Sequence, residues 1–338
     1  MKRIALLAGL LFLALGLATR AAEAATVIKL ATLVPDGSVW DKALKQMGSD
    51  WKERSDGRVT LRIYPGGVAG DEPDVVRKMR IGQIQAASLT VTGLSEIDPA
   101  FKVFTIPLFW DSYEELLFVL EAMEPYLAAK LEARGFVFVH WGHAGWVHLF
   151  SKDPIRRIAD LKQQKLFVWA GQDDMVQWWK RSGFKPVALA ATDIMTGLQT
   201  GMIEVLPTTP LAALNLQWFR QTPYMHELGL APLVGATVIT QKAWKKISAA
   251  DQKALLAVAR RTEEQLEKGI PQQDREAVEA MTKRGLEVIA VTDDTEWREA
   301  AAEFADTMRG AVVPAEAFDR ALAERSRFRS NKTDKVSP

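Results

Sequence analysis

Short apolar runs with strand periodicity alternate with segments of helical spacing through most of this 338-residue chain. The runs at 27–32, 59–64 and 84–91 are followed or preceded by Gly and Pro turn residues, and the alternation resumes at residue 135. Strands that alternate with helices predict an α/β fold with parallel sheets. Ligands of such folds bind outside the carboxyl ends of the strands, so two facing α/β domains predict a cleft between them.

A long, charged run of helical spacing begins near Lys242, after the alternation has ended. Ser248 is a suitable cap within it, and Pro271 is expected to interrupt or bend the helix before it resumes. Gly285 ends the run. A helix that returns so late in the chain can span two α/β domains and connect them.

The N-terminus predicts export. Lys2 and Arg3 precede an apolar run at 4–17, and Ala22-Glu-Ala24 has the small-x-small pattern of a cleavage site. We therefore expect residues 1–24 to form a cleaved secretory signal peptide and the mature protein to lie in the periplasm. An uncleaved membrane anchor is the alternative, but the run is short for a spanning helix.

The composition limits the classes of partner and of binding site that this chain can have. The 43 basic and 42 acidic residues nearly cancel, which leaves no electrostatic footprint for nucleic acid. The absence of cysteine excludes disulfides and thiolate metal sites. Eleven tryptophans against four tyrosines suggest an aromatic-lined cavity, because a buried indole N–H needs a partner.

Motifs for catalysis or for a cofactor are missing from the sequence. It contains no G-x-S-x-G and no H-E-x-x-H pattern, so we expect no enzyme. The glycine-rich loop at 66–70 lacks the Lys-Ser of a phosphate-binding loop, and Asp71 and Glu72 would repel phosphate. His140, His143 and His148 do not share one face of a strand, so we expect structural histidines and neither a metal nor a cofactor.

Six segments carry a family resemblance. They are KLATLVPDGSVWDKAL (29–44), GRVTLRIYPGGVAGDEPDVVRKMRIGQIQAA (57–87), IPLFWDSYEE (106–115), IADLKQQKLFVWAG (158–171), GLQTGMIEV (197–205) and ITQKAWKKISAADQKAL (239–255). In this order they resemble DctP-type solute-binding proteins of TRAP transporters. The resemblance implies a two-domain periplasmic binding protein that closes like a Venus flytrap around one small ligand. It also implies docking on a TRAP-type membrane permease driven by an ion gradient.

The resemblance and the patterns together give a domain division. We expect domain I to comprise 26–145 and about 231–275, and domain II to comprise 146–230 and about 276–326, with the long helix spanning both. Residues 327–338 are polar and end in proline, which predicts a disordered tail. We expect a monomer, since nothing in the sequence requires a helix exchanged between two copies.

The resemblance also carries over a ligand site, and here the chain departs from the family. Phe167 stands where the family has the arginine that clamps a substrate carboxylate, and a family proline becomes Trp169. A second arginine position aligns with Val147. The remaining aligned positions are Thr32, Thr90, Ala191, where some members have a stacking ring, and Thr208.

Four further residues are candidates by their place along the chain. Trp110 lies in the loop after Pro107, and Trp141, His143 and Trp146 lie where the chain is expected to cross between domains. All four are also consistent with plain core packing. Of the neighbouring Trp178 and Trp179, which share a helix, we expect at most one to face the cleft.

The loss of two cations predicts a ligand without a strong negative charge, because an unpaired charge in a closing cleft is costly. We therefore expect a largely apolar or weakly charged small ligand. One alternative for Phe167 is that it packs in the core between strands while another residue holds a carboxylate. An alternative function is a receptor for an organic monocarboxylate or aromatic acid, held by the amides at a helix N-terminus or by a bridging cation. Another is a periplasmic lipid carrier or scaffold that acts with a partner protein.

Overall fold

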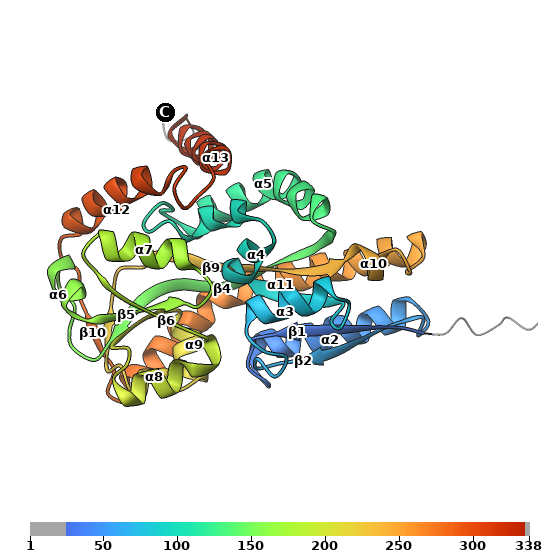
Figure 1. Cartoon of the computed structure of the whole chain (residues 1–338), viewed down its shortest axis with the longest axis horizontal. Coiled ribbons are helices and arrows are strands. Elements are labelled where there is room, and N and C mark those ends of the chain that lie inside the picture. The colour runs from blue at the N-terminus through green and yellow to red at the C-terminus, as the bar shows by residue number, and fades with distance from the viewer. Residues whose placement is uncertain (1–24, 335–338) are drawn as a thin grey trace, which may run out of the picture.

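The structure is a computed structural model that describes residues 25–334 and has a mixed α/β architecture (Figure 1). The strands are β1 (Thr26–Thr32), β2 (Val59–Tyr64), β3 (Ala86–Thr90), β4 (Phe136–Ser151), β5 (Lys165–Trp169), β6 (Lys185–Leu189), β7 (Val205–Thr208), β8 (Tyr224–His226), β9 (Ala231–Thr240) and β10 (Glu287–Ile289). The α-helices are α2 (Val39–Arg54), α3 (Glu72–Arg80), α4 (Val91–Ile97), α5 (Tyr113–Ala133), α6 (Ile158–Gln163), α7 (Asp173–Arg181), α8 (Ile194–Thr200), α9 (Pro210–Asn215), α10 (Gln241–Trp244), α11 (Ala249–Thr282), α12 (Thr295–Met308) and α13 (Ala315–Asp334). Short 3-10 helices are η1 (Pro99–Thr105), η2 (Ala191–Asp193) and η3 (Trp218–Arg220). The predicted signal peptide lies outside the described residues.

The strands run in the order β2-β1-β3-β9-β4-β7-β5-β6, with β8 beside β4 and β10 beside β8. The pairs of β1 with β2 and β3 are parallel, as are the pairs of β5 with β6 and β7. Strand β9 is antiparallel to both β3 and β4. We call β1, β2 and β3 with their helices the first half, and β5, β6 and β7 with theirs the second half.

A two-stranded ribbon joins the halves. The 16-residue strand β4 pairs with β9 from Phe136 to Val147, and its end pairs with β7 and β8 of the second half. The register of β4 against β9 shifts twice, between Phe138 and His140 and between His143 and Trp146. Each such shift leaves backbone groups of β4 without a ladder partner.

Amphipathic helices close the core of the first half. In α2, the residues Trp40, Leu44, Met47 and Trp51 recur at helical spacing and are buried, and the Ser38 hydroxyl caps the helix by accepting from the Asp41 amide. Met47 and Trp51 pack with β1 and with the first turns of α11. The second half has smaller apolar clusters, one of which contains Phe167.

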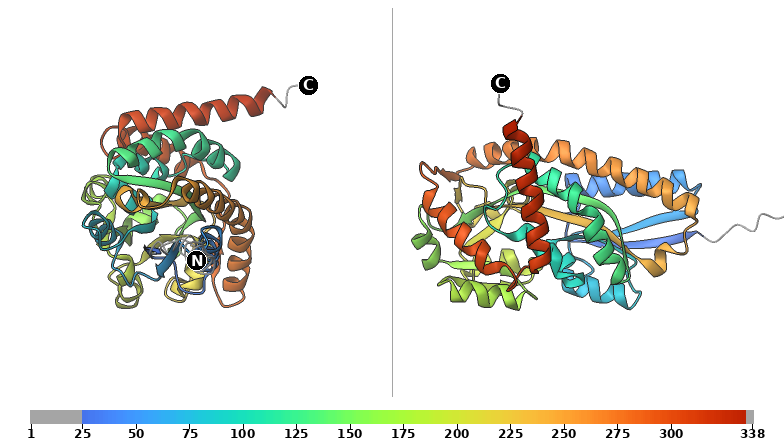
Figure 2. Two further views of the ribbon diagram at one scale, coloured as in Figure 1. Left: turned by 90° about the vertical axis from the view of Figure 1, so that its right-hand side faces the viewer. Right: turned by 90° about the horizontal axis from the view of Figure 1, so that it is seen from above.

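The long helix α11 runs alongside both halves (Figure 2) and packs on α2, β4 and α9. Its helical assignment continues through Pro271. Two of its carboxylates bind amides near the register shifts: Glu263 accepts from the Trp141 amide at 2.9 Å, and Asp274 accepts from the Leu211 amide at 3.0 Å and from the Trp146 amide. The helix thereby supplies the partners that the irregular strand lacks.

The predicted disordered tail is wrong for residues 327–334, because α13 continues to Asp334 and lies beside α5 (Figures 1 and 2). Arg329 donates to both carboxylate oxygens of Glu115, at 2.7 and 2.9 Å. The Arg327 guanidinium lies 4.8 Å from the centre of the Phe118 ring. These side chains bind the polar helix to α5, an interaction that the composition of the tail does not indicate. Residues 335–338 lie outside the described part.

No helix within residues 25–334 has the length and apolar character needed to cross a membrane.

Candidate functional site

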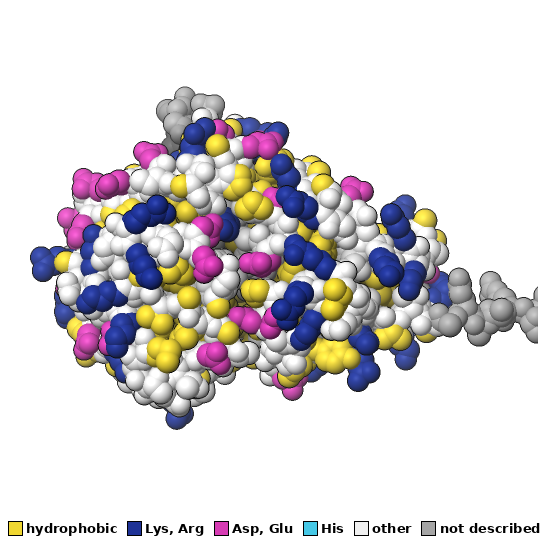
Figure 3. Space-filling view, in the orientation of Figure 1, with side chains coloured by type: hydrophobic (Ala, Val, Ile, Leu, Met, Phe, Trp, Pro, Cys, Tyr) yellow, Lys and Arg dark blue, Asp and Glu magenta, His cyan; other side chains and the backbone are white. Residues whose placement is uncertain are grey.

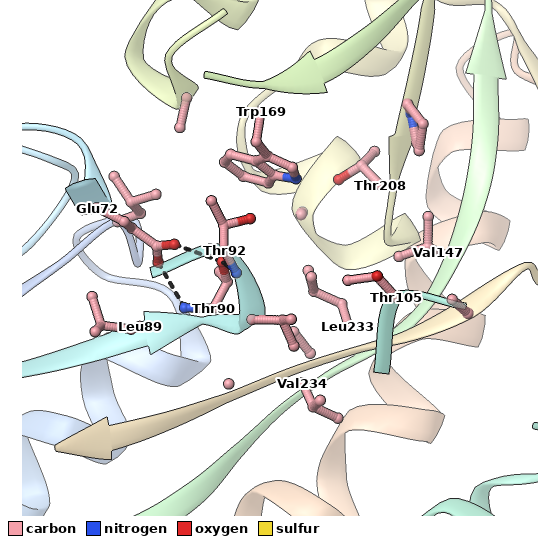
Figure 4. A pocket seen from close by; sticks show the side chains of 18 of the residues that line it. Glu72, Leu89, Thr90, Thr92, Thr105, Val147, Trp169, Thr208, Leu233 and Val234 are labelled. Atoms are coloured by element: carbon pink, nitrogen blue, oxygen red, sulfur yellow. Dashed lines mark hydrogen bonds between the residues drawn. The ribbon is translucent and has the colours of Figure 1, made fainter. Parts of the chain in front are cut away.

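A cavity of about 750 Å³ lies between the two halves, with the β4–β9 ribbon as its floor (Figure 4). Its first wall is built from the carboxyl ends of β1 and β3 and the start of α3. Its second wall is built from β5, the end of β7 and the segment before α8. The carboxyl ends of parallel strands thus meet across the cavity, as expected for an α/β ligand site.

The first wall is polar and internally hydrogen bonded. Glu72 is only 2% exposed, and its Oε1 accepts from the Thr90 amide at 2.7 Å. Its Oε2 accepts from the Thr90 hydroxyl at 2.6 Å and from the Gly93 amide at 2.8 Å. Burial raises the pKa of Glu72 to about 7, against the effect of these three donors. Thr32, at the end of β1, completes the wall.

The second wall is aromatic. Phe167 and Trp169 alternate along β5 and lie on one face, with ring centres 5.2 Å apart. Phe167 is 3% exposed and packs on Ile194, Leu198 and Leu206 while also lining the cavity. In Figure 4 the Trp169 ring faces Thr90 and Thr92 across the cavity, and Thr208 lies beside it. The ring is thus placed to cover a ligand held between the walls.

The floor carries two histidines that line the cavity, His140 and His143, which are 1% and 2% exposed. Burial lowers the pKa of each to about 4, so both imidazoles are neutral near pH 7. His140 holds the Trp141 carbonyl through Nδ1 at 2.7 Å, which assigns the ring proton to that nitrogen. The floor therefore contributes no positive charge.

The charged lining of the cavity is acidic and contains no cation among the described residues. Within residues 25–334, Glu72 is the single acidic residue that lines the cavity, and no lysine or arginine lines it. The same part of the chain contains no group of three or more His, Cys, Asp or Glu that could hold a metal ion. The site can thus bind by apolar contact, by ring stacking and through a few hydrogen-bonding groups.

Comparison with known proteins identifies the family. The family model for bacterial extracellular solute-binding proteins of family 7, DctP, matches residues 30–310. The chain is a family 7 solute-binding protein. The family resemblance predicted from the sequence is thereby confirmed, and the family consists of receptors, not enzymes.

Relatives of this family 7 protein are distant. YiiZ of Salmonella typhimurium is 28% identical over 183 residues, which span 53% of this chain and about half (55%) of YiiZ. A solute-binding protein of Roseobacter denitrificans is 26% identical and is matched over 72% of this chain and 74% of its own. The crystal structure of DctP7, a Bordetella pertussis receptor binding pyroglutamic acid, is 18% identical, covers 89% of this chain and 100% of its own, and has a TM-score of 0.82. The predicted two-domain fold class is confirmed by such structures.

Most of the residues predicted for the site of this family 7 protein do line the cavity. They are Thr32, Thr90, His143, Phe167, Trp169, Ala191 and Thr208, together with Val147. Their contact with a ligand stays a prediction. The alternative for Phe167 describes it equally well, because one face of the ring packs in the core and another part reaches the cavity.

Three predicted tryptophans do not line the cavity. Trp110 is 2% exposed and stacks between Phe104 and Phe109, and Trp141 is 2% exposed among Phe104 and other rings of the first half. Trp146 packs beside Gly229, at the edge of the same apolar cluster. These three indoles pack in the apolar cluster that α5 covers. The sequence pattern does not distinguish such a core position from a position in a cavity wall.

The sequence analysis missed several lining residues. Glu72 was noted only as unsuited to phosphate, because an acidic residue in the first turn of a helix is explained by the helix dipole alone. Trp178 and Trp179 both line the cavity, so the expectation that at most one faces it is wrong. Their rings lie at 76° to each other, which lets two neighbouring positions reach one surface. Trp40 and Trp218, from α2 and η3, were not predicted.

Proposed function

We propose that this chain is the periplasmic receptor of a TRAP-type transporter, which binds a largely apolar, non-anionic small ligand between its halves and delivers it to a membrane permease. The observation that carries the proposal is the cavity lining, where no lysine or arginine of the described residues is present and Phe167 occupies the second wall.

The cost of burying an unpaired anion supports this ligand class. A carboxylate enclosed without a cation or donors loses its hydration and gains nothing in return. The neutral His140 and His143 cannot replace an arginine, and Glu72 would repel the anion. Apolar groups, by contrast, gain about 0.8 kcal/mol for each buried CH₂.

Contacts between segments of the two halves support binding by closure. The Ala191 amide of the second half donates to Asp71 of the first at 3.3 Å, and Lys102 pairs with Asp174 on α7. Thr192 also approaches the turn at Gly67. These contacts fit a closed form of two domains with the predicted boundaries, 26–145 with 231–275 and 146–230 with 276–326.

An organic monocarboxylate is the second candidate, favoured by the pyroglutamic acid named for DctP7 of Bordetella pertussis. Backbone amides at the start of α4 could hold such an anion. However, the Thr92 amide already donates to the Thr90 hydroxyl and the Gly93 amide to Glu72. The amides nearest the cavity are therefore occupied.

Mass spectrometry of the ligand that co-purifies with the exported protein tests the proposal. We expect a neutral or basic, largely apolar compound, and a small dicarboxylate or sugar acid would overturn it. A thermal-shift screen separates the second candidate, because only a carboxylate receptor is stabilised by small organic acids. Light scattering tests the expected monomer, N-terminal sequencing tests cleavage after Ala24, and pull-down from membranes tests the permease.

A further inference from the structure

We propose that the ligand carries a cationic amine, bound between the Trp169 ring and the Glu72–Thr90 pair. The inference rests on the proposed function of the cavity and narrows its substrate class from non-anionic compounds to amines. Three features of the described residues carry it.

The hydrogen bonds of Glu72 leave the Thr90 hydroxyl as an acceptor at this end of the cavity. All three of its partners are donors, so both carboxylate oxygens are used as acceptors. The Thr90 hydroxyl donates its hydrogen bond to Glu72 and accepts one from the Thr92 amide at 3.2 Å. The Thr90 hydroxyl oxygen can therefore only accept a further hydrogen bond, and a ligand N–H group can donate it.

The buried carboxylate has no counter-charge. No ion pair to Glu72 occurs among the described residues, and the lining contains no basic side chain that is charged at neutral pH. Burial raises the pKa of the neighbouring Asp71, and the charges of Asp74 and Asp193 raise it further. Several acidic side chains lie along the seam between the halves (Figure 3). A ligand cation supplies the charge that the protein omits.

The opposite wall presents aromatic faces. Trp169 reaches over the Thr90–Thr92 end of the cavity (Figure 4), Trp178 and Trp218 line it from the same half, and Trp40 lines it from the first half. Indole faces attract cations and tolerate alkyl or aromatic substituents. A carboxylate below an indole, with no arginine near, therefore suits an ammonium group that bears an apolar body.

A matched series of probes tests the inference: benzylammonium, benzyl alcohol and benzoate share one ring and differ in charge. Binding is followed by tryptophan fluorescence and by thermal shift with the full mature chain. We expect benzylammonium to bind about tenfold more tightly than benzyl alcohol, and benzoate to bind weakest.

Two variants test whether the preference for benzylammonium depends on Glu72. In Glu72→Gln the preference for benzylammonium over benzyl alcohol should fall to within about threefold. Asp74→Asn, which removes the same charge from the exposed side of the same helix, should retain the preference. If Glu72→Gln does not fold, Trp169→Leu replaces it and should also reduce the preference.

The outcomes separate the two proposals. Benzyl alcohol bound as well as benzylammonium overturns the amine and leaves the apolar receptor standing. Benzoate bound best overturns both. A failure of benzylammonium to bind at about 10 mM, well beyond a millimolar dissociation constant, also overturns the amine.

Discussion

The two walls of the cavity are built alike and differ in chemistry. Both consist of the carboxyl ends of parallel strands, yet the first wall presents Thr90 and the buried Glu72, and the second presents Phe167 and Trp169. The first is a hydrogen-bonded surface with a negative charge, and the second is a mainly aromatic surface whose polar side chains, Gln172, Thr192 and Thr208, are uncharged. The strand ends thus determine where the proposed ligand site lies, whereas a few side chains determine which ligand charge that site can accept.

The largest effect is expected when the second wall is made cationic. Phe167→Arg buries an unpaired guanidinium among Ile194 and Leu198, which should cost about 3–5 kcal/mol of unfolding free energy. Added benzoate should recover part of the loss, because it pairs with the arginine. Chemical denaturation with and without benzoate measures both. Phe167→Leu, which should lose about 1 kcal/mol and show no response to benzoate, is the control; a stable Phe167→Arg without added acid would contradict an enclosed apolar wall.

The charge of the first wall should be visible in the pH dependence of stability. The pKa of Glu72 is raised from 4.5 to about 7, because burial disfavours its charged form when no cation is bound. Its contribution is complete below pH 4.5 and is lost as the pH rises through 7. Relative to Glu72→Gln, the wild type should therefore lose about 3 kcal/mol of unfolding free energy between about pH 4 and 8. Urea unfolding across this range measures it, and parallel curves for the two proteins would refute the desolvated carboxyl.

A smaller effect is expected from Trp169, the ring that we propose covers the ligand. Trp169→Ala should weaken binding of the co-purified ligand about tenfold, or about 1.4 kcal/mol, because a stacking face is lost. Titration calorimetry on protein freed of its ligand measures the change. The control is Trp110→Phe, whose indole lies in the core outside the cavity and whose loss should lower stability but leave affinity unchanged. Equal affinities for wild type and Trp169→Ala would exclude the second wall from the binding surface.

The smallest effect concerns an ion pair between η1 and α7. Lys102 pairs with Asp174, and the side chains are 11% and 44% exposed. Since such partly exposed pairs contribute about 0–1 kcal/mol, Lys102→Ala should weaken ligand binding about two- to fivefold, mainly through faster release. A double-mutant cycle with Asp174→Ala, followed by stopped-flow fluorescence, measures the coupling. No coupling between the two positions would mean that the pair does not contribute to closure.

The sequence predicted those parts of the fold that rest on local periodicity. The run at 59–64 coincides with β2, and Lys165–Trp169 coincides with β5. The sequence did not reveal that β4 continues to Ser151, because its two register shifts and its glycines break the alternation on which the prediction depends. Strand β9 was also missed, and the end of α13, residues 327–334, was taken for a tail because its contacts lie on a distant helix.

The site was predicted where the family motif fixes the strand ends and was missed where tertiary packing decides. Phe167, Trp169 and Thr208 follow from the motif, since the end of a strand determines which side chains face the cleft. Whether Trp110 and Trp141 lie in the core or in the cavity wall depends on which helix covers them, and spacing along the chain does not show this. Glu72 needed knowledge of its three donors, which come from another strand end.

The two carboxylates of α11 have a mechanical consequence. Glu263 fixes the helix to β4 at Trp141, and Asp274 fixes it to the start of α9. Between these anchor points lies Pro271, which has no amide hydrogen to donate to the preceding turn. The bending stiffness of the helix is therefore lowest in this interval, and a change in the angle between the halves costs least when the helix flexes here.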